Sequence, residues 1–204
     1  MPIRKNPLLK LTKRFRKDED GVAAIEFAII APIMITMYFG LSEMATAIAV
    51  DRRISHGANV AADLLTQQAQ MSPIDIEETL AASVRVMGVA NVGDITMQIQ
   101  SYVLDSNDQM VREGLINFNT GASNLPAFDA STLSARVLSQ TSGVVVTRVA
   151  YTYSPLQLRY FNSDITLSET FLLKPRRSNA VVFAEDQGKI STCTGTSFGD
   201  VTCS

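Results

Sequence analysis

Histidine and cysteine are scarce in this sequence of 204 residues, which contains one histidine, His56, and two cysteines, Cys193 and Cys203. Three such residues cannot complete a four-ligand zinc site without acidic help. The G-x-S-x-G, H-E-x-x-H and phosphate-loop motifs are also absent. We therefore expect a protein that is not an enzyme and has no cofactor and no metal, with His56 as a solvated or packed side chain.

Three acidic residues near the C-terminus are the remaining candidates for a cation site. Glu185, Asp186 and Asp200 carry oxygen ligands that suit Ca²⁺, but calcium loops usually space their ligands at alternate positions. A solvated acidic edge is therefore the preferred interpretation of these residues.

Charge is nearly absent from one long stretch of the chain. Residues 21–42 are 22 residues long, and Glu26 is the one charged residue among them. At a rise of about 1.5 Å per residue, a helix of this length crosses a hydrocarbon core of about 30 Å. The stretch is therefore a candidate membrane helix.

The residues in front of this stretch predict its orientation. Seven are positive and three, Asp18, Glu19 and Asp20, are acidic. The positive residues are Arg4, Lys5, Lys10, Lys13, Arg14, Arg16 and Lys17. Because an excess of Lys and Arg stays on the cytoplasmic side, we expect a cytoplasmic N-terminus and a periplasmic C-terminal domain.

Glu26 is unusual in an apolar helix, because a carboxylate in hydrocarbon costs up to a few kcal/mol unless it finds a partner. A cut between Gly21 and Val22 would create an α-amino group at the start of the helix. Glu26 would then be the fifth residue of the mature chain and could pair with the amine of its own or a neighbouring subunit. The carboxylate would act as a docking group.

A basic leader that ends in glycine, followed by Glu-Phe and an apolar helix, resembles the processing site of type IV pilins and pseudopilins. More narrowly, residues 21–45 resemble the TadE-like minor pilins of the tight-adherence (Tad, Flp) pilus system. Residues 150–156 and 172–176 are similar to the Tyr-x-Tyr-x-Pro-Leu and terminal Pro-Arg segments of that family. The residues that carry the first resemblance are Gly21, Glu26, Phe27, Ala31, Pro32, Gly40 and Glu43.

The resemblance implies a minor pilin or pseudopilin that a prepilin peptidase cuts between Gly21 and Val22. It implies partners among other pilins and the assembly platform, and a place in the bacterial inner membrane or the assembled pilus. Glu26 and Phe27 would serve assembly, and Pro32, which removes a helical amide, would kink the helix. The side chains expected to pack between helices, or else to contact lipid, are Phe27, Ile29, Ile30, Ile33 and Met34.

Two other interpretations of the N-terminal region stay open. The helix could be an uncut anchor for a periplasmic binding or assembly module. Alternatively, Ala45, Thr46 and Ala47 could form a secretory cleavage site that releases a soluble enzyme or adhesin. The apolar region of a signal peptide is about 7 to 15 residues, however, which is shorter than this stretch.

The charge of the mature chain argues against a nucleic-acid partner. Without the leader, 11 basic residues stand against 17 acidic ones. Phosphate backbones require a basic face, and a net charge of about −6 does not supply one.

Both cysteines lie in the last twelve residues of the chain, on the predicted periplasmic side. An oxidising compartment permits a disulfide between Cys193 and Cys203, and a loop of about 11 residues adds roughly 2.5 to 3 kcal/mol in the chain-entropy model. Two free thiols or an intermolecular bridge are the alternatives.

Hydrophobic periodicity predicts the secondary structure of the remainder. A helix is expected to continue from the membrane to about Gln70, and Ser72 with Pro73 should start a second helix that Gly88 ends. Alternation and β-branched residues predict strands at 95–103, 110–118, 143–154 and 165–173, with a short edge strand at 180–184. Asp129 should cap a short helix over 130–138, and residues 188–204 should be a tail that only the disulfide holds.

These elements predict an α+β fold, in which a long N-terminal membrane-spanning helix packs on a mainly antiparallel sheet, as in pilins. The expected divisions are a basic leader over 1–21, a transmembrane and stalk helix over 22–70, and a periplasmic α+β domain over 71–204. The order of the strands does not follow from the sequence.

Overall fold

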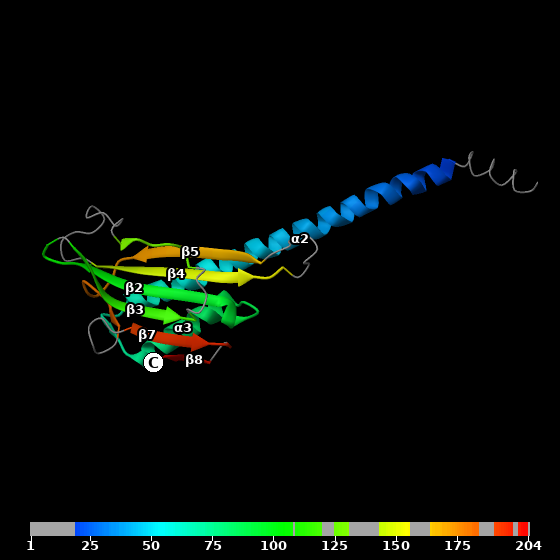
Figure 1. Ribbon diagram of the computed structural model, residues 1–204. Helices are drawn as coiled ribbons and strands as arrows, with labels where there is room; N and C mark the ends of the chain where they lie inside the picture. Colours follow the sequence, from blue (N-terminus) through cyan, green and yellow to red (C-terminus); the bar gives the residue numbers. More distant parts are fainter. Residues whose placement is uncertain are drawn as a thin grey trace, which may run out of the picture. The chain divides into compact units, whose positions relative to one another are not determined.

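The structure is a computed structural model that describes residues 19–107, 109–119, 125–130, 143–155, 164–183, 190–197 and 200–203. The chain divides into two compact units, Met1–Ala45 and Thr46–Ser204. Helix α2, Glu19–Thr66, passes through the boundary between them (Figure 1). Most of the predicted leader lies outside the described residues.

Helix α2 begins earlier than the sequence predicts. It starts at Glu19, whereas the expected start was at or just after Val22. Acidic residues are favoured in the first turn of a helix by its dipole. A glycine inside a helix costs only about 1 kcal/mol relative to alanine, so Gly21 does not interrupt it.

Helix α2 also ends earlier than predicted, at Thr66 rather than near Gln70. The next residues form strand β1, Gln70–Met71, which pairs in parallel with strand β6, Val182–Phe183. The predicted short strand at 180–184 therefore exists, but it belongs to a two-stranded sheet and not to the edge of the main one.

The second predicted helix is confirmed as α3, Pro73–Met87. The hydroxyl of Ser72 accepts a hydrogen bond from the backbone N–H of Asp75, and the Asp75 carboxylate accepts one from the backbone N–H of Ser72. Gly88 ends the helix in the left-handed conformation with φ 56°. This conformation favours glycine because no Cβ opposes it.

The four main predicted strands are confirmed and belong to a six-stranded sheet of order β5-β4-β2-β3-β7-β8. Its pairs are antiparallel except for β3 with β7, which is parallel. The α+β class with a mostly antiparallel sheet is therefore confirmed. The strands are β2 Ile95–Leu104, β3 Met110–Phe118, β4 Gly143–Tyr153, β5 Ile165–Leu173, β7 Ile190–Gly195 and β8 Val201–Cys203.

The prediction that only the disulfide holds the C-terminal tail was wrong. The tail contributes β7 beside β3 and β8 beside β7, with Leu115 opposite Ile190 and Cys193 opposite Cys203. Tertiary pairing overrides the turn-like composition of this segment, because main-chain hydrogen bonds are available to any residue except proline. The predicted helix over 130–138 lies outside the described residues beyond Ala130.

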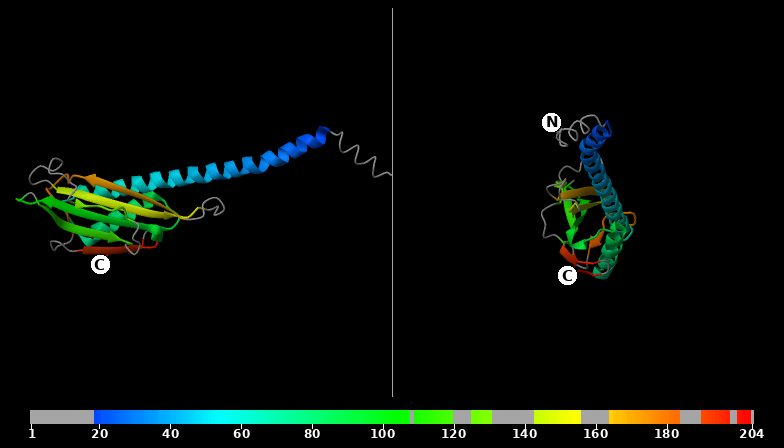
Figure 2. Two further views of the ribbon diagram at one scale, coloured as in Figure 1. Left: turned by 45° about the horizontal axis from the view of Figure 1, so that its top comes forward. Right: turned by 90° about the vertical axis from the view of Figure 1, so that its right-hand side faces the viewer.

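The core of the Thr46–Ser204 unit lies between its helices and one face of the sheet (Figure 2). The C-terminal turns of α2 place Ile54, Ala58 and Leu65 in this core. Short 3₁₀ helix η1, Val92–Asp94, leads into β2, whose alternate residues Ile95, Met97 and Ile99 are fully buried. The strand was expected to be half-buried, but Thr96 and Gln100 on its other face are buried as well.

Candidate functional site

The N-terminal turns of α2 form an apolar surface without a protein partner among the described residues. Side chains from residue 21 to 38 are exposed, except for a half-buried Ala31, and Phe27 is 73% exposed. The helix is long and apolar enough from Gly21 onward to cross a membrane, judged by length and composition. Water is a costly environment for such a surface, so lipid or other helices must cover it.

The residues expected to pack between helices all belong to this surface. Ile29, Ile30, Ile33 and Met34 are each more than half exposed. At about 100° per residue these four residues lie within about 140° on one face of the helix, and the exposed Ile25 and Ile35 extend the apolar surface around the rest of it. Such an all-round apolar helix is typical of a segment buried in a membrane or a bundle.

Glu26 lies on this helix next to Phe27 and is exposed. No Lys or Arg in the described part of the chain forms an ion pair with it. In a bilayer the carboxylate would therefore need a partner from outside the described residues.

Gly21 and Val22 lie inside the helical span, one turn or less after its start at Glu19. Open space surrounds the position where Gly21 would carry a side chain. The predicted cleavage point is therefore sterically accessible, but its backbone is helical.

Pro32 is accommodated within α2, which continues on both sides of it. The Pro32 ring leaves the Ala28 carbonyl without its usual amide donor. The Thr36 hydroxyl donates to the Pro32 carbonyl at 2.7 Å, a contact that often bends helices. The kink itself stays a prediction.

A disulfide joins Cys193 of β7 to Cys203 of β8, so the two cysteines are paired within the chain. The backbone N–H of Cys203 donates to the Glu77 carboxylate of α3 at 2.7 Å. This hydrogen bond therefore connects β8, at the edge of the sheet, to α3.

Reduction of this disulfide is expected to lower the free energy of unfolding by about 2.5 to 3 kcal/mol, because it frees a loop of about 11 residues in the unfolded chain. Urea titration of the full chain in detergent, followed by near-ultraviolet circular dichroism of its tyrosines, measures the change. The Cys203→Ser variant should show the same loss without reductant and no further response to it. Equal midpoints for the oxidised and reduced protein would contradict this expectation.

The segment with the terminal Pro-Arg pattern contacts the end of α2. The backbone N–H of Arg176 donates to the Thr66 carbonyl at 2.9 Å, and its guanidinium forms an ion pair with Asp63. Because the last turn of α2 contains no basic residue, Arg176 supplies the positive charge that a helix C-terminus favours. Sequence reasoning assigned no role to this residue.

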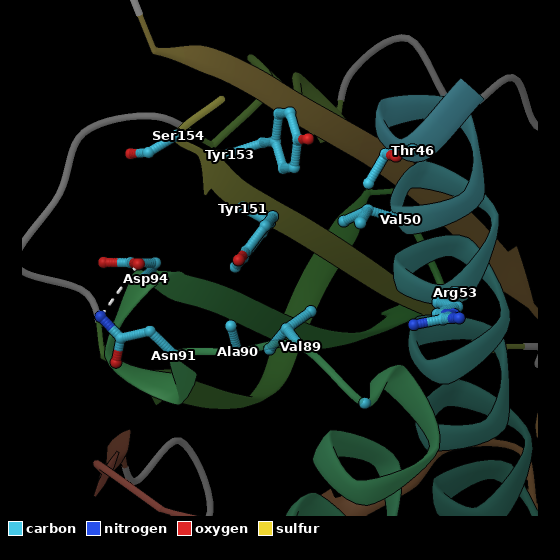
Figure 3. Close-up of a pocket in the computed structure, with 11 residues that line it drawn as sticks. Thr46, Val50, Arg53, Val89, Ala90, Asn91, Asp94, Tyr151, Tyr153 and Ser154 are labelled. Atoms are coloured by element: carbon cyan, nitrogen blue, oxygen red, sulfur yellow. Dashed lines mark hydrogen bonds between the residues drawn. The ribbon is translucent and has the colours of Figure 1, made fainter. Parts of the chain in front are cut away.

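The Tyr-x-Tyr segment lines a groove that sequence reasoning missed. The groove has a volume of about 650 Å³ and lies between α2, the loop after α3, and the end of β4. Figure 3 shows Thr46 and Val50 on α2 facing Tyr151 and Tyr153 on β4, with Asp94 at the opposite end. The alternation of Tyr151 and Tyr153 indicated that both face one side of the sheet, but it did not indicate what lies opposite them.

The structure describes two of the candidates for metal binding and base catalysis. His56 is exposed on α2, and Asp200 is exposed before β8. Glu185 and Asp186 lie outside the described residues. Within the described ranges, no group of three or more His, Cys, Asp or Glu residues could hold a metal ion.

Comparison with known proteins bears on the N-terminal segment. Residues 21–63 match the model of a family described as TadE-like protein. The resemblance predicted from Gly21, Glu26 and Phe27 is therefore confirmed over this segment, which associates the chain with the Tad pilus system. No curated protein and no solved structure matches the chain.

Proposed function

We propose, from its TadE-like segment at residues 21–63, that this protein is a minor pilin or pseudopilin for assembly of a Tad (Flp-type) adhesion pilus. The observation that carries the proposal is an exposed apolar helix with a single carboxylate, Glu26, five positions after the proposed cleavage point. An anchor without further function has no use for a carboxylate that hydrocarbon penalises.

In the proposed reaction sequence, a prepilin peptidase first cuts between Gly21 and Val22. The absence of a side chain at Gly21 leaves the scissile carbonyl unobstructed. Because this carbonyl lies in the helical span, the first turn of α2 must unwind before a protease can bind it in extended form. The first turn of a helix is the easiest to open, since its amides have no intrahelical acceptor.

Cleavage would free the amine of Val22 for a pair with Glu26 of the same or a neighbouring subunit. Phe27 and the other exposed apolar residues of α2 would then pack against the helices of other pilins. The 183 residues from Val22 to Ser204 make a subunit far larger than the short major pilin implied by the resemblance. This size supports a minor subunit over the bulk of the filament.

The proposed location is the bacterial inner membrane, with a cytoplasmic N-terminus and the disulfide-bonded domain in the periplasm. The seven basic residues before residue 18 support this orientation, and a disulfide suits an oxidising compartment. From there the subunit could enter the extracellular pilus. Its proposed partners are the peptidase, other pilins and the assembly platform.

The test is the N-terminal residue of the protein from membranes of its native host, with and without active prepilin peptidase. We expect Val22 when the peptidase is active and a longer chain when it is not. Met1 under both conditions would support an uncleaved periplasmic binding or assembly module. Ile48 would support secretory release, and either result would contradict the proposed processing.

A further inference from the structure

The main sheet has two edges, and they differ in how well they are protected against the addition of another strand. Strand β8 forms one edge, is three residues long and is joined to β7 by the disulfide. The backbone N–H of Cys203 in this strand already donates to the Glu77 carboxylate of α3. A very short edge strand and cover by another element are ordinary ways to prevent strand addition. The β8 edge is therefore poorly suited to bind a further strand.

Strand β5 forms the opposite edge and has no such protection (Figure 1). It is nine residues long and contains no proline, lysine or arginine. It pairs with β4 without a bulge from Ile165, opposite Tyr153, to Leu173, opposite Val145. No hydrogen bond joins its outer side to any residue that the structure describes. A regular edge of this length presents a row of backbone N–H and C=O groups with which a further strand can pair.

The side chains of β5 suit an extension of the sheet on both of its faces. On the core face, Ile165, Leu167 and Phe171 pack against the main core but remain partly exposed. Glu169, on the same face, is the one charged residue in the strand. A neighbouring strand would cover the remaining apolar surface. The residues between them on the other face are uncharged and at least partly exposed, namely Thr166, Ser168 and Thr170.

A second copy of this chain is the occupant that the two edges favour. Because β8 is protected, the second copy can offer its own β5, and an antiparallel pairing about a two-fold axis places core face beside core face. A register with Glu169 opposite Glu169 is unfavourable, since like charges directly opposite destabilise a sheet. A register with Ser168 opposite Ser168 avoids this contact. The other opposite pairs are then Ile165 with Phe171, Thr166 with Thr170, and Leu167 with Glu169.

Pair chemistry favours the register centred on Ser168. Its aromatic–β-branched and Thr–Thr pairs each occur twice, and both kinds stabilise sheets. The opposite shift places Thr170 at the axis, so Ser168 would face Leu172 and Ile165 would face Pro175. Proline has no N–H for the ladder, and this shift gives a single Thr–Thr pair.

We propose that β5 of this chain pairs antiparallel with β5 of a second copy, centred on Ser168. The two six-stranded sheets then form one continuous sheet, in which residues 165–171 of each copy make the interface. This pairing requires neither cleavage after Gly21 nor assembly into a pilus, and it does not depend on how deeply α2 enters a membrane.

The first test is site-directed crosslinking of the full chain in detergent with a short bismaleimide. The native cysteines form a disulfide, so the reagent reacts with an introduced cysteine. In Ser168→Cys the two thiols lie opposite each other, with Cβ atoms about 4.5 to 5.5 Å apart. In Leu172→Cys, an exposed control position on the same face, they lie eight residues apart along the strands, or roughly 27 Å. We expect covalent dimer from Ser168→Cys and at least tenfold less from Leu172→Cys.

A charge at the two-fold axis should weaken the dimer in solution. Ser168→Lys places two ammonium groups directly opposite each other and should raise the dissociation constant about tenfold or more. Leu172→Lys adds the same charge to the same strand outside the paired residues and should change the constant less than about twofold. Analytical ultracentrifugation in detergent measures both constants. Because Ser168 and Leu172 are exposed, each variant should fold, and circular dichroism checks this.

Hydrogen exchange identifies the surface that the dimer uses. Alternate amides of β5 point away from β4, so they should exchange slowly in the dimer and quickly in the monomer. Peptides that cover residues 165–173 should therefore gain protection as the protein concentration rises, whereas peptides that cover β8 should not. A dimer held by the exposed apolar part of α2 would leave the exchange of β5 unchanged.

Four results would overturn the proposal. Equal crosslinking from both cysteine variants would indicate random collision or association through α2. A chain that stays monomeric at every concentration, or a dimer that Ser168→Lys does not weaken, would exclude the pairing of β5. In native membranes, crosslinking of Ser168→Cys to a different protein alone would assign the β5 edge to a strand of that protein. A failure of processing or of pilus assembly would leave all these readouts unchanged.

Discussion

Replacement of Glu26 by alanine is expected to reduce assembled pilus about tenfold or more, while the protein is still cut after Gly21. The carboxylate is the one charge between residues 21 and 42, and a free amine in hydrocarbon without its partner costs a few kcal/mol. Each 1.4 kcal/mol of lost docking energy corresponds to a factor of ten. Quantification of sheared pili, together with the N-terminal residue of the membrane-bound protein, measures both expectations.

Two further variants separate the charge of Glu26 from other effects. Glu26→Gln keeps the size of the side chain and should lose assembly to a similar degree, because an amide cannot form the ion pair. Thr36→Ala should assemble normally, since its hydroxyl already donates to the Pro32 carbonyl within the same helix. Wild-type amounts of pilus from Glu26→Ala would exclude the docking role.

Replacement of Asn119 by alanine is expected to lower the free energy of unfolding by about 3 to 4 kcal/mol. The Asn119 side chain donates to the carbonyls of Val92 and Gly195 and accepts from the backbone N–H of Gly195. Alanine removes three hydrogen bonds and leaves partly buried backbone groups unpaired, which costs about 1 kcal/mol or more each. Asn119 also has φ 49°, a conformation that asparagine tolerates better than alanine.

Urea titration of the full chain in detergent measures this loss, and two variants interpret it. Asn119→Asp keeps the acceptor for Gly195 but loses both donors, so it should fall between the wild type and alanine. Asn179→Ala changes an exposed side chain and should alter the free energy of unfolding by less than about 0.5 kcal/mol. An Asn119→Ala variant as stable as Asn179→Ala would contradict the role of these hydrogen bonds.

Helix α3 illustrates why many elements were predictable. Ser72, Asp75 and Gly88 act on backbone groups within a few residues of themselves, so their pattern contains the whole cause of the helix ends. The alternation in β2 is similar, because residues two apart share a face whatever lies beside them. Structural features with local causes of this kind can be predicted from the sequence alone.

The limits of α2 were less predictable for the opposite reason. Its end at Thr66 coincides with contacts from Arg176, a residue 110 positions later. No residue near Thr66 in the sequence indicates this contact. The continued alanine-rich pattern favoured a longer helix. The TadE-like motif around Gly21 could be recognised from the sequence, but the helical state of its backbone could not.

The sequence by itself determined the apolar helix with its lone Glu26, the TadE-like start at Gly21, the caps of α3 and the main strands. Each of these depends on residues that are neighbours in the chain. Only the tertiary structure decided that β7 and β8 join the sheet, that Asn119 binds Gly195, and that Arg53 and Tyr151 share a groove. Apart from the pairing of β8 with β7, these features depend on pairs 70 or more residues apart, and the free energy of such contacts exists only once the chain has folded.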